Sequence, residues 1–104
     1  MKEITRNGDS IHVKLRGDLT STRNTSFEIE MIRMIQKDSP KELIIDFDEV
    51  KMIDSFGIRG LFSINENIGK VNGKLKAVNV SSVIYGLFVN MRLNTHFEIS
   101  EKKE

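Results

Sequence analysis

The sequence contains no cysteine and only two histidines, His12 and His96, which lie far apart. The absence of cysteine excludes disulfides, thiolate metal sites and cysteine nucleophiles. Two isolated histidines do not make the ligand cluster that a histidine-rich metal site requires. We therefore expect neither a metal ion nor a cofactor.

Long apolar runs and an excess of one charge are also missing. No apolar run approaches the roughly 18 residues that suggest a membrane span, and residues 1–8 lack the apolar core of a signal peptide. Sixteen basic residues oppose fifteen acidic ones, so the net charge of +1 argues against a basic nucleic-acid-binding surface. We expect a cytoplasmic protein that binds neither a membrane nor nucleic acid directly.

The chain has the size and composition of one globular domain. Its 104 residues are enough for a single hydrophobic core. Apolar residues make up 38% and charged residues 30%, which is typical of a soluble protein with a charged surface. We expect one domain over residues 1–104, with residues 100–104 as a frayed tail.

Residues 1–16 predict a β-hairpin. Residues 7–9, Asn-Gly-Asp, supply the turn because Asn-Gly tolerates the positive φ values that tight hairpins need. From Ile11 to Arg16, apolar and polar residues then alternate, which is the pattern of a strand with one wet face. His12 falls on the polar face, so we expect it to be exposed to solvent.

A helix is predicted to begin within the run of small polar residues that follows. Thr25 and Glu28 fit a capping box, although Ser21 or Thr22 could cap an earlier start. The helix ends before Pro40, because the residue preceding a proline is disfavoured in the α region. Its apolar stripe consists of Phe27, Met31, Met34 and Ile35.

Strands and helices alternate along the rest of the chain. We expect a strand at residues 42–47, a helix opening at Ser55, a strand at residues 74–80, a helix capped at Ser81-Ser82 and a strand at residues 96–99. The predicted apolar faces are Leu61, Ile64, Ile68 and Val71 in the second helix, and Ile84, Leu87, Phe88 and Met91 in the third. The order β-β-α-β-α-β-α-β predicts an α/β fold with a mixed, mainly parallel sheet of about five strands and helices packed against it.

Three connections lead from a strand into a helix, and right-handed crossovers would place all of them at one edge of the sheet. They are residues 17–22, 48–55 and 79–82. This arrangement gathers Asp18, Asp54 and Ser55 at one end of the domain. In open α/β sheets, ligands and partners tend to bind at the carboxyl ends of the strands, so we expect the functional site there.

Gly57 and Gly60 lie in the first turns of the second helix, where each costs about 1 kcal/mol in helix propensity relative to alanine. Their missing side chains would leave that end of the helix open to a partner backbone. Close packing against the sheet explains them equally well. The sequence leaves both interpretations open.

Asp46 and Asp48 are the best candidates for catalysis, because they point to the same side of an extended strand. Paired carboxylates do acid–base chemistry or hold Mg²⁺. No histidine, cysteine or glycine-rich phosphate loop lies nearby, and the chain is short for a deep substrate pocket in addition to a core. We therefore expect no enzyme, and we interpret both carboxylates as solvated charges at a strand end.

A response-regulator receiver is another small α/β domain with an acidic cluster. It would need an acidic pair after the first strand and a lysine after a late strand. The first strands offer only Asp9 and Asp18, and Val80 rather than a lysine follows Asn79. The sequence does not favour this class.

Ser55 has a structural and a functional interpretation. As the N-cap of the second helix it would accept from free backbone amides, and its replacement by alanine would cost about 1 kcal/mol. The same position suits a phosphate, because the amides and the helix dipole favour an anion there. Phosphorylation adds a charge of roughly −1.5 to −2, which beside Asp54 and Asp18 would repel a partner docked on this edge.

The segment Asp54-Ser-Phe-Gly-Ile-Arg-Gly-Leu61 resembles the signature of STAS domains, in particular the bacterial anti-sigma factor antagonists, whose pattern is Asp-Ser-x-Gly-Leu-Gly. The resemblance covers nearly the whole chain. It includes the hairpin, the turn at residues 17–19, the strand entry at residues 73–75 and the late segment at residues 94–99.

The resemblance implies a phosphorylation-switched binding protein with no catalytic activity. Ser55 matches the serine that the partner, an anti-sigma factor serine kinase, phosphorylates. The unphosphorylated antagonist binds that kinase and frees the sigma factor, the phosphorylated form lets go, and a serine phosphatase resets it. Asp54 matches the acidic residue beside the phosphorylated serine, and Asp18 matches the acidic residue of the family's Gly-Glu/Asp-Leu turn.

Three residues depart from the family's pattern. Thr20 stands where many members carry an aspartate, Arg92 takes a usual glycine position, and Phe56 replaces a small residue. Phe56 is closer to the scaffold-type STAS proteins of stress-sensing complexes, which is the alternative function. By resemblance we expect a monomer or weak dimer. The expected partner-binding residues are Asp18, Thr20, Asp54, Ser55, Phe56, Gly57 and Arg59.

Overall fold

The computed structural model describes residues 2–103, with the backbone alone at residues 21 and 22. Its strands are β1 (Lys2–Asn7), β2 (Ser10–Arg16), β3 (Glu42–Glu49), β4 (Lys74–Val80) and β5 (Glu98–Glu101). Its helices are α1 (Ser21–Asp38), α2 (Ser55–Gly69), α3 (Ser82–Asn90) and the short 3₁₀ helix η1 (Leu93–Thr95). The predicted element order is confirmed.

The strands form one five-stranded sheet in the order β1-β2-β3-β4-β5. β1 and β2 are antiparallel, and every later neighbour is parallel. The predicted hairpin is present: Gly8 and Asp9 connect the paired residues Asn7 and Ser10, and Gly8 has φ +64°. The mixed, mainly parallel sheet expected from the sequence is therefore confirmed.

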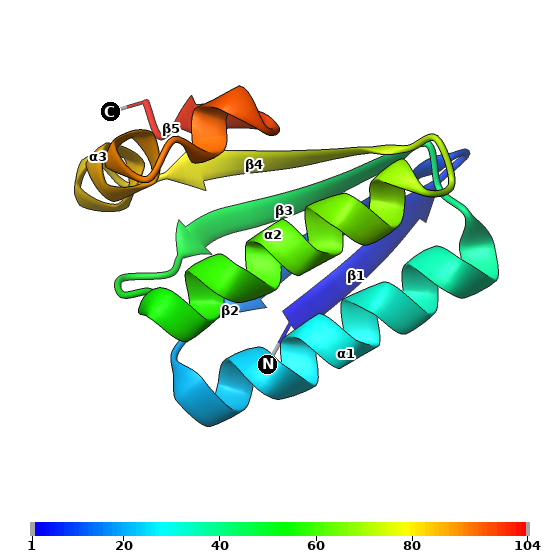
Figure 1. Ribbon diagram of the computed structural model, residues 1–104, viewed down its shortest axis with the longest axis horizontal. Helices are drawn as coiled ribbons and strands as arrows, with labels where there is room; N and C mark the ends of the chain where they lie inside the picture. Colours follow the sequence, from blue (N-terminus) through cyan, green and yellow to red (C-terminus); the bar gives the residue numbers. More distant parts are fainter. Residues whose placement is uncertain (1, 104) are drawn as a thin grey trace.

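Helices α1 and α2 lie side by side against one face of the sheet (Figure 1). Alternate apolar residues of the central strands point into this layer and are buried: Ile11, Val13, Leu15, Leu43, Ile45, Phe47, Leu75 and Ala77. The predicted stripe of α1 is buried throughout. On α2, Leu61, Ile64 and Ile68 are buried, whereas Val71 follows the helix and packs at the margin of the core. The core thus lies between the sheet and the two helices.

The opposite face of the sheet carries no helix within residues 2–103 (Figure 1). The side chains on this face are mostly polar. His12 is exposed there, as predicted. Glu42 joins three strands on this face, because it accepts from Ser10 Oγ at 3.0 Å and pairs with Lys76 Nζ at 2.7 Å. Parallel sheets are usually covered on both faces. Here cross-strand polar pairs make one face compatible with water.

Helix α3 sits beside the end of β4, apart from α1 and α2 (Figure 1). Ser81 caps it as predicted, since its Oγ accepts from the Ile84 N–H at 3.3 Å. Met91, assigned to the apolar stripe, is 48% exposed because it lies at the C-cap, past the last turn. That assignment was wrong. No helix within residues 2–103 is long and apolar enough to cross a bilayer.

The ends of three other elements differ from expectation. β3 continues to Glu49, two residues beyond the predicted end at residue 47. α1 begins at Ser21 with Thr20 as a cap that makes no side-chain bond, so the capping box at Thr25 was wrong. It ends at Asp38, before Ser39 turns left-handed at φ 44°. β5 extends to Glu101, later than predicted, and the N–H of the next residue donates to the Val80 carbonyl at 2.7 Å. Residue 104 of the predicted tail lies outside the described residues.

Candidate functional site

The β2–α1 and β3–α2 connections pair with each other at the carboxyl end of the sheet. The Leu19 N–H donates to the Met52 carbonyl at 3.2 Å, and the Asp54 N–H donates to the Leu19 carbonyl at 3.3 Å. Leu19 and Ile53 form a parallel bridge. The pairing of β2 with β3 thus resumes beyond the strands, up to the residue that caps α2. The predicted proximity of these two connections is confirmed.

Asp18 and Thr20 belong to the first of the paired connections. Asp18 Oδ1 accepts from the backbone amides of Lys51 at 2.8 Å and Met52 at 3.0 Å. Thr20 precedes α1, and its carbonyl accepts from the Arg23 amide at 3.1 Å. The structure therefore gives Asp18 a bracing role that the sequence did not suggest. The binding roles predicted for both residues remain predictions.

Asp54, not Ser55, is the N-cap of α2. Asp54 has extended backbone angles, and its Oδ1 accepts from the amides of Phe56 at 3.0 Å and Gly57 at 3.1 Å. Ser55 is already the first helical residue, and its side chain is exposed. The prediction that Ser55 caps the helix was wrong. Both residue types are strong caps, and only the backbone angles show which one fills the position.

Gly57 and Gly60 are both buried where α2 begins. A Cβ on Gly57 would lie 2.6 Å from the Leu19 carbonyl oxygen and 2.5 Å from Ile53 Cγ1. A Cβ on Gly60 would lie 2.7 Å from Asn24 Oδ1. Of the two interpretations left open, close packing describes both glycines. Their neighbours are the β2–α1 connection, Ile53 and α1 rather than the sheet.

Asn24, which the sequence analysis did not single out, is buried against the start of α2. Only 3% of it is exposed, and its Nδ2 donates to the Phe56 carbonyl at 2.7 Å. A signal was present: Asn24 lies three residues before Phe27 and seven before Met31, on the buried face of the helix. A polar residue on an apolar stripe predicts a buried hydrogen bond.

Large apolar side chains are exposed at this end of the domain. Met52 is 62% exposed in the β3–α2 connection, Phe56 is 52% exposed in the first turn of α2, and Val83 is 80% exposed in the first turn of α3. The Arg59 guanidinium lies 5.6 Å from the centre of the Phe56 ring. Exposed apolar groups gathered at one end are typical of an interaction surface. Met52 and Val83 were not among the residues predicted from the sequence.

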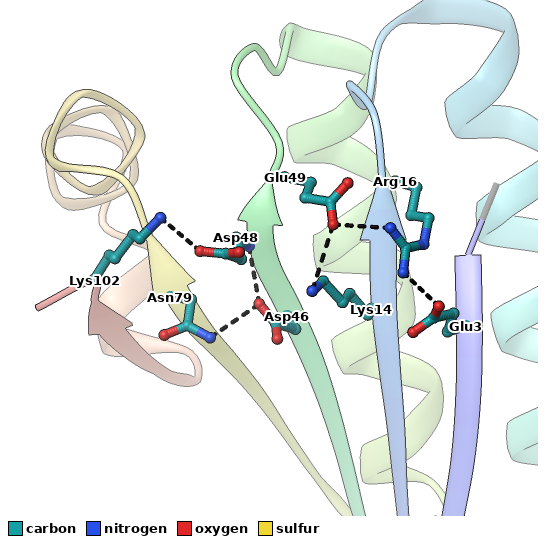
Figure 2. Close-up of polar contacts among 8 residues, drawn as sticks. All are labelled: Glu3, Lys14, Arg16, Asp46, Asp48, Glu49, Asn79 and Lys102. Carbon is teal, nitrogen blue, oxygen red and sulfur yellow. Dashed lines mark hydrogen bonds and ion pairs between the residues drawn. The ribbon is translucent and has the colours of Figure 1, made fainter.

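The acidic residues at the end of β3 are matched by cations and amides (Figure 2). Lys102 Nζ lies 2.6 Å from Asp48 Oδ1 and lowers the pKa of that carboxyl. Asp46 Oδ1 accepts from the Asp48 amide at 2.9 Å and from Asn79 Nδ2 at 3.1 Å. Among the described residues, no group of three or more histidine, cysteine, aspartate or glutamate side chains could hold a metal ion.

A second row of charges continues across β2 to β1 (Figure 2). Glu49 lies 3.4 Å from Lys14 Nζ and 2.9 Å from an Arg16 nitrogen. Arg16 also pairs with Glu3, lowering the pKa of Glu3 and raising its own. The acidic residues at positions 46, 48 and 49 are therefore part of a network of ion pairs and hydrogen bonds on the uncovered face.

The family model of the STAS domain matches residues 1–104. The chain belongs to the STAS domain family, as the resemblance implied. None of the curated proteins matches it by sequence.

Solved structures share the fold at low sequence identity. An anti-sigma factor antagonist from Mycobacterium paratuberculosis is 21% identical, with a TM-score of 0.82 over 96% of this chain and 84% of that one. A variant of RsbS from Moorella thermoacetica is 17% identical, with a TM-score of 0.79 over 99% of this chain and 87% of that one. The Bacillus cell fate determinant SpoIIAA in its phosphorylated form is 15% identical, with a TM-score of 0.76 over 95% of this chain and 90% of that one.

Proposed function

We propose that the protein is an anti-sigma factor antagonist that regulates transcription by partner switching. In its unphosphorylated form it binds an anti-sigma factor serine kinase in the cytoplasm. Phosphorylation at Ser55 releases the kinase, and a serine phosphatase restores binding. The proposal is carried by one observation: Ser55 is exposed at the first position of α2 while Asp54 holds the cap.

The division of labour between Asp54 and Ser55 suits a reversible modification. Since the Asp54 carboxylate satisfies the amides of Phe56 and Gly57, modification of Ser55 leaves the cap in place. The helix dipole favours an anion at this end. The switch therefore acts on the surface without requiring the helix to unfold.

The phosphate would act through its neighbours. It adds roughly −1.5 to −2 charges in the same segment as two exposed apolar side chains, Met52 and Phe56. A partner that covers these side chains must also take the phosphate out of water, and burying an unpaired charge is strongly unfavourable. Release follows from this desolvation cost and from repulsion by Asp54.

The proposed binding residues divide into two groups. Phe56 and Arg59 are exposed and would contact the partner together with Thr20 and Ser55. Asp18, Asp54 and Gly57 act from within, because they brace the paired connections, cap α2 and allow its close approach to Leu19. Substitutions in the second group therefore affect binding through the shape of the surface.

The experiment combines the purified protein, its cognate anti-sigma factor kinase and ATP, and locates the phosphate by mass spectrometry. We expect phosphate on Ser55 and at least tenfold weaker kinase binding by Ser55→Asp, about 1.4 kcal/mol. Ser100→Asp, an exposed serine on β5, is the matched control and should bind normally. Absence of phosphate from Ser55, together with unimpaired binding by Ser55→Asp, contradicts the proposal.

The alternative is a non-catalytic scaffold subunit of a stress-sensing complex. The bulky exposed ring of Phe56 beside Ser55 favours it, because a large apolar group suits a lasting contact. This function predicts a large particle when the protein is mixed with related STAS chains and passed over a sizing column. Elution as a free monomer in that mixture contradicts it.

A further inference from the structure

Asn24 is the one buried polar or charged residue among the side chains that the structure describes. Its Nδ2 donates to the Phe56 carbonyl at 2.7 Å, across 32 positions of sequence. Asn24 belongs to α1, and Phe56 follows Ser55 in the first turn of α2. The bond therefore fastens α1 to the turn that presents the serine.

The amide occupies a space that α2 leaves open for it. A Cβ on Gly60 would lie 2.7 Å from Asn24 Oδ1 and 2.8 Å from Asn24 Nδ2. The absence of that atom lets the amide lie against α2 and reach the Phe56 carbonyl. The sequence thus provides an asparagine on one helix and a glycine on the other for a single contact.

Packing alone does not explain an asparagine here. A leucine has the same branched outline, although it is bulkier, and carries no amide to desolvate, whereas a buried amide is costly unless it is hydrogen-bonded. What the amide adds is direction, because a hydrogen bond fixes the orientation of the carbonyl that it reaches. That carbonyl belongs to the residue immediately after Ser55.

We propose that Asn24 is a positioning residue that holds Ser55 in the orientation required for phosphorylation. The inference rests on the proposed function. In the transfer, Ser55 Oγ forms a bond to the γ-phosphorus of ATP while the bond to the β,γ-bridging oxygen breaks, its electron pair leaves with ADP, and the hydroxyl proton passes to a base of the kinase. Such transfer depends mainly on placing the attacking oxygen in line.

Asn24 is buried and would not touch the partner, whereas the turn that it fastens also carries Phe56, a proposed partner contact. The exposed side chains of Met52 and Val83 lie outside the first turn of α2. Loss of the Asn24 bond loosens the turn that carries Ser55 and Phe56 and leaves Met52 and Val83 in place. The effect should therefore fall mainly on kcat for phosphorylation and less on KM, because a misplacement of the attacking oxygen by about 1 Å costs up to about a hundredfold in rate.

The test compares Asn24→Leu with Asn67→Leu. Asn67 Nδ2 donates to the Ser63 carbonyl at 2.8 Å, so the control removes the same kind of bond from the far half of α2. With cognate kinase and ATP, we expect Asn24→Leu to lower kcat at Ser55 about tenfold and to change KM by a smaller factor. Asn67→Leu should keep both values. Hydrogen exchange at the amides of residues 56–58 should be faster in Asn24→Leu alone.

The outcomes separate the two proposals. If the wild-type protein is phosphorylated at Ser55 and Asn24→Leu keeps its kcat and KM, the positioning role is overturned and the proposed function stands. If the wild-type protein takes no phosphate, the proposed function fails first. Unchanged hydrogen exchange at residues 56–58 in Asn24→Leu would show that Asn24 does not stabilise the turn, which also contradicts the positioning role. If Asn24→Leu does not fold, Asn24→Ser, which also loses the amide, takes its place with the same expectations.

Discussion

The carboxylate of Asp18 accepts a hydrogen bond from the backbone amide of Met52 at 3.0 Å, although the two residues lie 34 positions apart. The same oxygen accepts from the Lys51 amide. Asp18 therefore fixes the connection that leads into α2 in the protein on its own, without a bound partner. A substitution of Asp18 therefore tests the bracing role through the stability of the protein.

Asp18→Ala should lower the free energy of unfolding by about 1–3 kcal/mol, because two amides lose an ionised acceptor. Glu66→Ala, which removes an exposed carboxylate from α2, should change it by less than about 0.5 kcal/mol. Urea denaturation followed by circular dichroism measures both. Equal stability of the two variants would show that Asp18 does not brace the connection.

Replacing the cap should cost more than replacing its neighbour. Asp54→Ala removes the acceptor of two helix amides and should destabilise the protein by about 0.5–2 kcal/mol. Ser55→Ala, at the first helical position, should change stability by less than about 0.5 kcal/mol. Thermal unfolding of both variants provides the measurement. A larger loss of stability in Ser55→Ala than in Asp54→Ala would show that Ser55, and not Asp54, caps the helix.

Two glycine substitutions should change the free energy of unfolding in opposite directions. Gly57→Ala places a Cβ against the Leu19 carbonyl, which is backbone, so we expect a loss of about 1–3 kcal/mol. A Cβ on Gly86 of α3 meets no atom within 4 Å, so Gly86→Ala should gain up to about 1 kcal/mol in helix propensity. Denaturation midpoints decide, and a stabilising Gly57→Ala would contradict the close packing.

Low pH should weaken the ion pair of Glu42 with Lys76 and its hydrogen bond with Ser10. Lys76 and Ser10 hold the pKa of Glu42 below its ordinary 4.5. The stability that ionised Glu42 contributes is therefore complete above pH 4.5 and is lost as the pH falls through the lower pKa of the folded state. The effect is modest because the pair is partly exposed.

Glu42→Gln should flatten the fall in stability below about pH 4.5, whereas Glu66→Gln should not. Urea midpoints measured across the acid range test this. The pKa of Lys76 is raised from 10.5 by Glu42, so its side of the same pair is lost only at strongly alkaline pH. Identical acid profiles for wild type and Glu42→Gln would rule the pair out as a source of stability.

The exposed apolar residues should govern affinity for the kinase. Phe56→Ser and Met52→Ser should each weaken binding about tenfold, since large apolar side chains at the centre of an interface carry much of its energy. Ile29→Ser is the matched control: Ile29 is 46% exposed on α1. Calorimetric titration of the kinase compares the three. Equal weakening by Ile29→Ser would place the binding surface elsewhere.

The fold was predictable because its signals are local. Alternation after Asn7-Gly8, the stripe from Phe27 to Ile35 and the break at Pro40 each specify an element within a few residues. The mainly parallel sheet then followed from the alternation of strands and helices. The errors lie at element ends, where the sequence offers several adequate caps, as at Asp54 and Ser55.

The candidate site was predictable in position but not in its contacts. Residues far apart in sequence make it: Asp18 with Met52, Asn24 with Phe56, and Leu19 with Gly57. Local patterns carry no information about such pairs. The exposure of Met52 was missed for the same reason, because its orientation depends on a connection that Asp18 holds in place.

The sheet order β1-β2-β3-β4-β5 repeats the order of synthesis. Each strand that leaves the ribosome finds its neighbour already made, with no gap kept open for a later segment. Growth from the N-terminus therefore adds one edge at a time, and each new strand pairs with the strand just before it in the sequence. The two connections that brace Ser55 are complete once β3 and the first turn of α2 have been made, before β4 exists.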